Sequence, residues 1–210
     1  MRPLLFVIVF GGALLLGSAP RPANGYEFIG GVWPAEWMPI PYCVNADNIP
    51  IGAGDVPVLS PEGFAARVRA AFQTWEDLPD SSITFAYQGF CSNSPWEYSD
   101  YVNTIGWDWL WGGVAGLAHT GPQGDGARIR GDFGQIYEVD VVIDTRLAQS
   151  FDDVGYYVDV VLPHILVHEI GHFIGLGHSR EACSVMAPSG LKPGLCDDDI
   201  QAMRVLYPPR

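Results

Sequence analysis

The spacing of hydrophobic and polar positions predicts a chain of short strands separated by a few longer helices. Alternating or short apolar segments bounded by turn residues are typical of strands. Such segments occupy residues 40–45, 82–87, 104–107, 116–119 and 139–144.

Three other segments have the 3.6-residue period of an amphipathic helix. The first covers residues 61–76, with Ser60 as its N-cap and Pro61 in its first turn. Its apolar face consists of Phe64, Val68, Phe72 and Trp75.

The second helix is predicted over residues 159–176 and the third over 198–206. Pro163 marks the start of the second helix, because a proline in the first turn removes no internal hydrogen bond. The inward face of the third consists of Ile200, Met203 and Leu206. The elements in this order predict an α+β domain: a twisted, mostly parallel five-stranded sheet with an antiparallel edge strand, two main helices and a C-terminal helix.

The beginning of the chain has the pattern of a secretory signal. Arg2 precedes an apolar run at residues 4–16, and small residues follow at 23–25. A membrane span needs about 20 apolar residues, which is more than this run contains. We therefore expect a signal peptide at residues 1–25, one domain at 26–210, and no membrane span in the mature form.

The chain is acidic, with a net charge of −13. The charge becomes −15 if Arg2 and Arg21 leave with the signal. Such a surface repels phosphates, which argues against nucleic acid and anionic membranes as partners. Residues 197–199, three consecutive aspartates, are interpreted first as a helix N-terminus. Ca²⁺ binding by clustered aspartates elsewhere is the alternative.

The most specific motif is His-Glu-Ile-Gly-His at residues 168–172. Residues four apart on a helix lie one above the other, so His168 and His172 can bind one ion at about 2.0 to 2.1 Å. Glu169 lies on the same turn and can contact a water at that ion. This spacing predicts a metal centre with an adjacent general base.

A third histidine, His178, follows the motif after two glycines. It could not reach the ion on a continuous helix, because six more residues rise roughly 9 Å. Gly175 and Gly177 therefore predict a helix end and a turn that returns His178 as the third ligand.

Three histidines leave the fourth tetrahedral position of Zn²⁺ for a water. Zinc lowers the pKa of that water to about 7 and polarises a carbonyl. Glu169 can accept the proton and later deliver it to the leaving amine. The motif thus predicts one catalytic zinc and hydrolysis of an amide bond.

Residues 168–178, followed by Ser-Val-Met-Ala-Pro at 184–188, resemble the metzincin metallopeptidases, whose pattern is H-E-x-x-H-x-x-G-x-x-H and then a methionine turn. Ser179 is the matrixin (matrix metalloproteinase) residue at this place, where astacins carry Glu and adamalysins Asp. Further likeness lies at residues 71–75, 83–85, 116–119 and 198–200. The resemblance implies a metzincin, zincin-like catalytic domain over residues 26–210.

The resemblance also implies a role for each matching residue. The zinc ligands would be His168, His172 and His178. Glu169 would be the general base, and Met186 would form a hydrophobic floor under the metal. An edge strand carrying Gly116, Leu117 and Ala118 would pair with an extended peptide substrate.

Matrixins also hold a second, structural zinc with several histidines and an aspartate. This chain keeps His119 in the corresponding strand but has Glu-Val-Asp at 138–140, where another histidine would be expected. We therefore do not expect the structural zinc, and we interpret His119 as a strand residue near the cleft.

Four cysteines in an exported chain indicate two disulfides, for which three pairings exist. The preferred pair is Cys183 with Cys196. It would close a short loop around residues 188–195, the segment that in matrixins walls the pocket for the residue after the cut bond. Cys43 would then pair with Cys91.

Three tryptophans at positions 107, 109 and 111 occur close together. They could bind a hydrophobic or carbohydrate ligand, but tryptophans in loops more often cover the core that they flank. Packing is the preferred interpretation.

The motif and its resemblance predict a secreted or extracellular zinc metalloendopeptidase, periplasmic in a Gram-negative bacterium, that cleaves peptide or protein substrates as a monomer. One alternative is a peptidase that processes a narrow set of targets. Another is a zinc-binding module of metzincin shape with little turnover. The presence of Glu169 favours an enzyme, because an inactive relative would usually have lost the base.

Overall fold

The computed structural model describes residues 25–52, 55–97, 99–119 and 134–209. Apart from Gly25, the predicted signal peptide lies outside the described residues.

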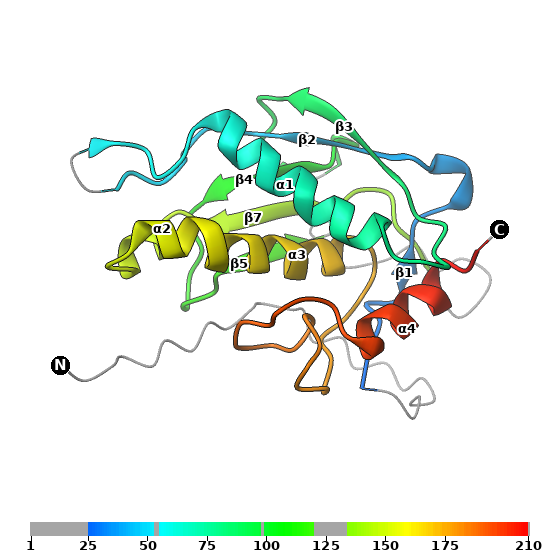
Figure 1. The fold of residues 1–210 in the computed structure, drawn as a ribbon. Helices are drawn as coiled ribbons and strands as arrows, with labels where there is room; N and C mark the ends of the chain where they lie inside the picture. The colour runs from blue at the N-terminus through cyan, green and yellow to red at the C-terminus, as the bar shows by residue number, and fades with distance from the viewer. Residues whose placement is uncertain (1–24, 53–54, 98, 120–133, 210) are drawn as a thin grey trace.

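Five strands form one mixed sheet in the order β3-β2-β4-β7-β5 (Figure 1). They are β2 (Ile40–Val44), β3 (Phe85–Phe90), β4 (Thr104–Asp108), β5 (Gly116–His119) and β7 (Asp140–Asp144). The first four strands in this order, β3, β2, β4 and β7, run parallel to one another. β5 pairs antiparallel with β7 at one edge of the sheet. The predicted mostly parallel, five-stranded sheet is confirmed.

Two details of the sheet differ from the sequence prediction. The strand expected at 82–87 begins only at Phe85 and continues to Phe90, because the backbone N–H of Ser82 donates to the carbonyl of Tyr207 instead of joining a ladder. The sequence also did not predict β1 (Gly31–Val32) and β6 (Gly134–Gln135), which pair parallel as a separate two-stranded sheet.

Helices α1 (Pro61–Glu76) and α3 (Leu162–Phe173) lie side by side on one face of the sheet (Figure 1). The hydroxyl oxygen of Ser60 accepts the N–H of Gly63 at 3.0 Å and caps α1, as predicted. The predicted apolar face of α1 is fully buried. The indole N–H of Trp75 donates to the carbonyl of Val167 at 2.9 Å and so joins the two helices.

The start of the second helix was predicted wrongly. Helical structure begins earlier, with α2 (Val154–Tyr156) and a π-helical turn at Tyr157–Val161 that continues directly into α3. Pro163 therefore lies inside a continuous helical segment. In a π-helix the backbone N–H of residue 163 would donate to the carbonyl of Val158, five residues earlier. Pro163 has no N–H, so it cannot make this hydrogen bond. The guanidinium Nε of Arg67, from α1, donates to that carbonyl at 2.8 Å instead.

The end of the second helix also differs, since α3 stops at Phe173 and not at residue 176. The C-terminal helix α4 (Asp197–Leu206) agrees with its prediction, and its first turn contains the three consecutive aspartates. On α4, Met203 and Leu206 are buried as expected, whereas Ile200 is only half-buried. No helix among the described residues is long and apolar enough to cross a membrane.

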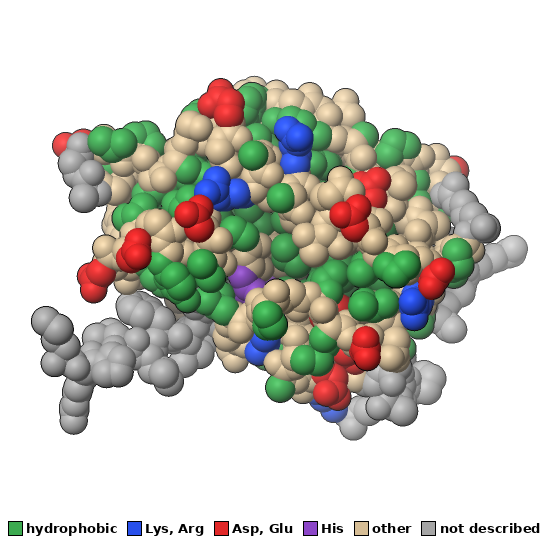
Figure 2. Space-filling view, viewed as in Figure 1, with side chains coloured by type: hydrophobic (Ala, Val, Ile, Leu, Met, Phe, Trp, Pro, Cys, Tyr) green, Lys and Arg blue, Asp and Glu red, His purple; other side chains and the backbone are tan. Residues whose placement is uncertain are grey.

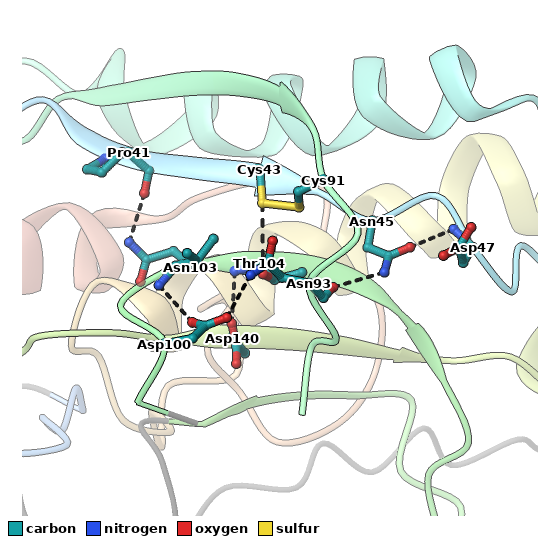
Figure 3. Close-up of a disulfide and its surroundings, with 11 residues drawn as sticks. Pro41, Cys43, Asn45, Asp47, Cys91, Asn93, Asp100, Asn103, Thr104 and Asp140 are labelled. Carbon is teal, nitrogen blue, oxygen red and sulfur yellow. Dashed lines mark hydrogen bonds between the residues drawn. A yellow bond between two sulfur atoms is a disulfide. The ribbon is translucent and has the colours of Figure 1, made fainter. Parts of the chain in front are cut away.

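Both preferred disulfides are present, Cys43–Cys91 and Cys183–Cys196. Figure 3 shows the first of them joining β2 to the residue that follows β3. Beneath it, Asp140 accepts the backbone N–H of Thr104 at 2.8 Å. Burial raises the pKa of Asp140 to about 8. The second disulfide ties the start of α4 to the segment that follows α3.

Candidate active site

Three histidines meet at the C-terminal end of α3. The potential ligand nitrogens of His168, His172 and His178 all lie within 4.8 Å of one another. Among the described residues, these three form the one group of side chains placed closely enough to hold a metal ion. The sequence-predicted ligands are therefore brought together.

Hydrogen bonds orient the two histidines of α3. The Nδ1 of His168 lies 2.7 Å from the carbonyl of Val185, and the Nδ1 of His172 lies 2.7 Å from that of Leu176. A carbonyl only accepts, so each Nδ1 carries the proton and each Nε2 presents a lone pair. Second hydrogen bonds of this kind commonly fix metal-binding histidines.

The Nε2 atoms of His172 and His178 are buried and have no hydrogen-bond partner among the described residues. A buried nitrogen lone pair without a partner costs free energy. A Zn²⁺ ion bound by three neutral imidazoles would satisfy these atoms, so the residues present fit this metal. Burial also lowers the pKa of all three histidines, which keeps them neutral.

The turn after α3 brings His178 back, as the sequence predicts. Gly175 has φ +105°, and the N–H groups of Gly175 and Leu176 donate to the carbonyls of His172 and Gly171. This is the Schellman arrangement that ends a helix with a left-handed glycine. Gly177 serves a different purpose from the one predicted. Its φ is not positive, but a β-carbon there would lie 3.2 Å from the backbone of Glu27.

The segment at residues 25–29 supports this turn. The bonds Ile29 N–H to Gly175 carbonyl, Gly177 N–H to Glu27 carbonyl and Arg180 N–H to Gly25 carbonyl run antiparallel along it. Sequence reasoning missed this pairing, because the segment has no distinctive strand pattern.

Met186 packs against α3 at Gly171, the residue before His172. It is 2% exposed, and a β-carbon on Gly171 would meet its sulfur at 2.1 Å. Gly171 lies between the two α3 histidines, directly before His172. The absence of a side chain at Gly171 is thus what admits Met186 against the helix.

Glu169 is completely buried beside the strand β5. A β-carbon on Gly116 would lie 2.7 Å from the Oε1 of Glu169, so the carboxylate packs directly on the backbone of that glycine. Burial raises the pKa of Glu169 well above its ordinary value, and the backbone amide of Ala118 opposes this shift in part. The Ala118 amide is near enough to favour the ionised form, but it does not have full hydrogen-bond geometry, so neither oxygen of Glu169 has a hydrogen-bond partner among the described residues.

The strand β5 is the sheet edge next to this carboxylate. Within the described part of the chain its ladder partner is β7 alone. Gly116 and Ala118 share the face that is turned toward Glu169, and the intervening Leu117 belongs to the opposite face. Figure 2 shows a histidine side chain at the surface between the main body and the C-terminal part.

Two aspartates of α4 hold the segment around Met186 in place. Asp199 accepts from the hydroxyl of Ser184 and from the backbone N–H groups of Val185 and Cys196. Asp198 accepts from the hydroxyl of Ser179 at 2.6 Å and from the N–H of Gly25 at 3.0 Å. Sequence reasoning placed both at a helix N-terminus but missed the contacts with Gly25, Ser179, Ser184 and Val185, since these donors are 14 or more residues away in the chain.

His119 is a strand residue, as predicted, but its ring does not face the cleft. It is on the same face of β5 as Leu117, opposite to Glu169. Its Nε2 lies 2.8 Å from the carbonyl of Pro95, and its ring stacks on Trp96 with centroids 5.1 Å apart. Burial lowers the pKa of His119.

A mixed sheet packed on two helices, with three converging histidines and an adjacent buried glutamate, defines the metzincin class of fold. The sequence pattern of the matrixin peptidase family matches residues 53–208, which include all three histidines. The chain belongs to the matrixin family.

Relatives agree with this assignment. Metalloendoproteinase 4-MMP of Arabidopsis thaliana is 38% identical over 187 residues, covering 81% of this chain and 46% of that protein. Interstitial collagenase of Sus scrofa is 26% identical over 157 residues, covering 73% and 30% respectively. The chain thus spans less than half the length of these relatives.

Among solved structures, a chain of the ECX AB5 holotoxin in its GM1-bound form has a TM-score of 0.50 at 14% identity. The match covers 88% of this chain and 87% of that one. At this identity the likeness concerns the fold alone.

Proposed function

We propose that this protein is a secreted, zinc-dependent endopeptidase that hydrolyses peptide bonds in extended protein substrates. Matrixin membership implies zinc dependence and hydrolase activity. The observation that carries the proposal is the triangle of histidine nitrogens within 4.8 Å of one another, next to the buried carboxylate of Glu169.

The proposed roles follow from the surroundings of each residue. His168, His172 and His178 would hold the zinc, which when bound lowers the pKa of a water and polarises a carbonyl. Glu169 would take a proton from the attacking water and deliver it to the leaving amine nitrogen. Its raised pKa supports this double role, because burial makes the carboxylate a stronger proton acceptor than an exposed glutamate.

The substrate would bind along β5. An extended peptide can add to a sheet edge through backbone hydrogen bonds, here with Gly116, Leu117 and Ala118. The contact of Gly116 with Glu169 would place the reacting carbonyl close to the base. Because backbone groups make these bonds, many sequences could be bound.

Secretion is part of the proposal. It is supported by the N-terminal signal pattern and by the two disulfides, which persist in oxidising compartments. The catalytic unit would then be residues 26–210 in its monomeric form.

Hydrolysis of casein and of a peptide library by the secreted protein tests this function. We expect turnover that a chelator abolishes and added Zn²⁺ restores. Glu169→Ala should lose the activity but retain one bound zinc per chain by metal analysis. Glu62→Gln, an exposed glutamate in the first turn of α1, is the matched control and should keep full activity.

Full activity in Glu169→Ala would contradict the mechanism. Zinc bound without turnover of any peptide would instead favour the binding module. Cleavage of a few library members with none of casein would indicate a narrowly specific peptidase.

A further inference from the structure

Four aromatic rings form a continuous series beside the edge strand, which we call the ring series: Trp109, Trp111, Trp96 and His119. Successive ring centroids lie 6.4, 6.3 and 5.1 Å apart. The last three rings are nearly parallel, with interplanar angles of 15° and 14°.

The outer end of the ring series is open to solvent. Trp109 is 53% exposed and Trp111 is 60% exposed, whereas the neighbouring Trp107 is only 2% exposed and packs on Phe64. The preferred interpretation that these tryptophans cover the core is therefore correct for Trp107 alone. Exposed aromatic rings held side by side are typical of binding surfaces.

The exposed rings are held in fixed positions. The guanidinium of Arg146 lies 4.8 Å from the ring centroid of Trp109 and bonds to the carboxylate of Asp144 at 3.1 Å and to the carbonyl of Leu110. Trp111 begins a tight turn through two glycines with φ +72° and +76°, and its carbonyl accepts the N–H of Val114. A ligand would thus meet a surface that is already ordered.

Charge indicates what this surface would bind. The Arg146 contact shows that an indole of the series accepts a guanidinium on its face, an attraction that comes from the negative ring face. Carboxylates flank the series, since Asp108 precedes Trp109 and Glu97 follows Trp96. The whole chain carries a net charge of −13, and Figure 2 shows acidic side chains spread over the viewed face. A cationic partner fits both the negative faces of the rings and the negative electrostatic potential of the chain.

The ring series is continuous with the edge strand. Trp111 precedes β5 by a single tight turn, and His119 is the last residue of β5. Because His119 lies on the face of β5 opposite to Glu169, a peptide paired with β5 would meet the ring series through the side chains that it turns to that opposite face. Residues some distance from the cut bond would be the ones to meet the exposed indoles.

We propose that the ring series is a subsite for arginine or lysine side chains of the substrate, so that this peptidase favours basic proteins. The proposal rests on the proposed peptidase function for its substrate but not for the binding itself. The cation would lie on the open face of Trp111, in the same way as Arg146 lies on Trp109.

Matched fluorogenic peptides test this proposal with the full secreted chain. One core sequence that the enzyme cleaves is made with arginine, with citrulline, its uncharged isostere, or with glutamate, two to five residues from the cut bond. We expect kcat/KM to be highest for arginine at one of these positions. Trp111→Ala should lower the ratio of kcat/KM for the arginine peptide to kcat/KM for the citrulline peptide about fivefold. Trp37→Ala, which removes an exposed tryptophan outside the series, should leave the ratio unchanged.

Binding of the same labelled arginine peptide, measured by fluorescence anisotropy, separates the two proposals. If nothing is cleaved, the peptidase proposal fails, while a Kd weakened by Trp111→Ala and by salt still supports the subsite. An arginine to citrulline ratio and a Kd that are both unchanged in Trp111→Ala would overturn it. Binding of a neutral oligosaccharide that depends on Trp111, without any preference for arginine, would also overturn it.

Discussion

Two buried carboxylates near the histidine cluster have opposite surroundings. Asp199, at the start of α4, accepts two hydrogen bonds from the segment that carries Met186 and a third from the N–H of Cys196. Glu169, between α3 and β5, is buried as deeply, but its oxygens complete no hydrogen bond with another described residue.

This difference separates an acid that maintains structure from one that is available for chemistry. Hydrogen-bond donors stabilise a buried carboxylate and fix its position. A buried carboxylate without them has a raised pKa and destabilises the fold when it is ionised. The C-terminal region is thus stabilised by its acids, whereas the α3–β5 region carries an acid at a cost to stability.

The largest expected effect is that of Glu169→Gln on activity. Loss of the general base should lower kcat/KM by about 10³-fold or more. Because the folded-state pKa of Glu169 is raised, its contribution to stability is present below the ordinary value of 4.5 and is lost as the pH rises. The metal-free variant should therefore unfold at the same or a higher temperature than the wild type at pH 7. A clear loss of stability in this variant would show that ionised Glu169 does not destabilise the fold.

Asp199→Ala, in contrast to Glu169→Gln, should destabilise the fold. The hydroxyl of Ser184 and two backbone N–H groups would lose their acceptor, which we expect to lower the free energy of unfolding by about 3 kcal/mol. Denaturant titration of the metal-free protein measures this. Asp197→Ala, at an exposed position of the same turn, is the control and should change it by less than about 0.5 kcal/mol. Equal effects of the two substitutions would show that the three hydrogen bonds of Asp199 do not stabilise the fold.

A smaller effect is expected for Gly116→Ala, which tests the contact between β5 and Glu169. The new β-carbon would lie 2.7 Å from the carboxylate, so either the strand or the side chain must move. A displacement of this kind can lower kcat/KM by up to about 100-fold. Val205→Ala, at an exposed position of α4, leaves β5 unchanged and should have little effect. A Gly116→Ala enzyme with normal kinetics would mean that Glu169 does not depend on this close packing.

The sequence predicted the elements whose pattern is local. The apolar face of α1, its Ser60 cap, the edge strand at 116–119 and the glycine that ends α3 are all as expected. The start of α3 was misplaced because the π-helical turn depends on Arg67, which lies about 90 residues earlier and replaces the donor that Pro163 lacks. No local pattern around Pro163 contains that information.

The sequence by itself determined which side chains could bind a metal, because a helical period and one left-handed glycine suffice to bring three histidines together. Only the tertiary structure decided how those side chains are oriented and what surrounds them. The Val185 carbonyl that fixes the His168 proton, the Val185 N–H that binds Asp199 and the bare backbone beside Glu169 come from distant segments, and the exposure of the indoles next to β5 depends on what packs around them. Hydrogen bonding and burial depend on these long-range contacts, which residue spacing does not encode.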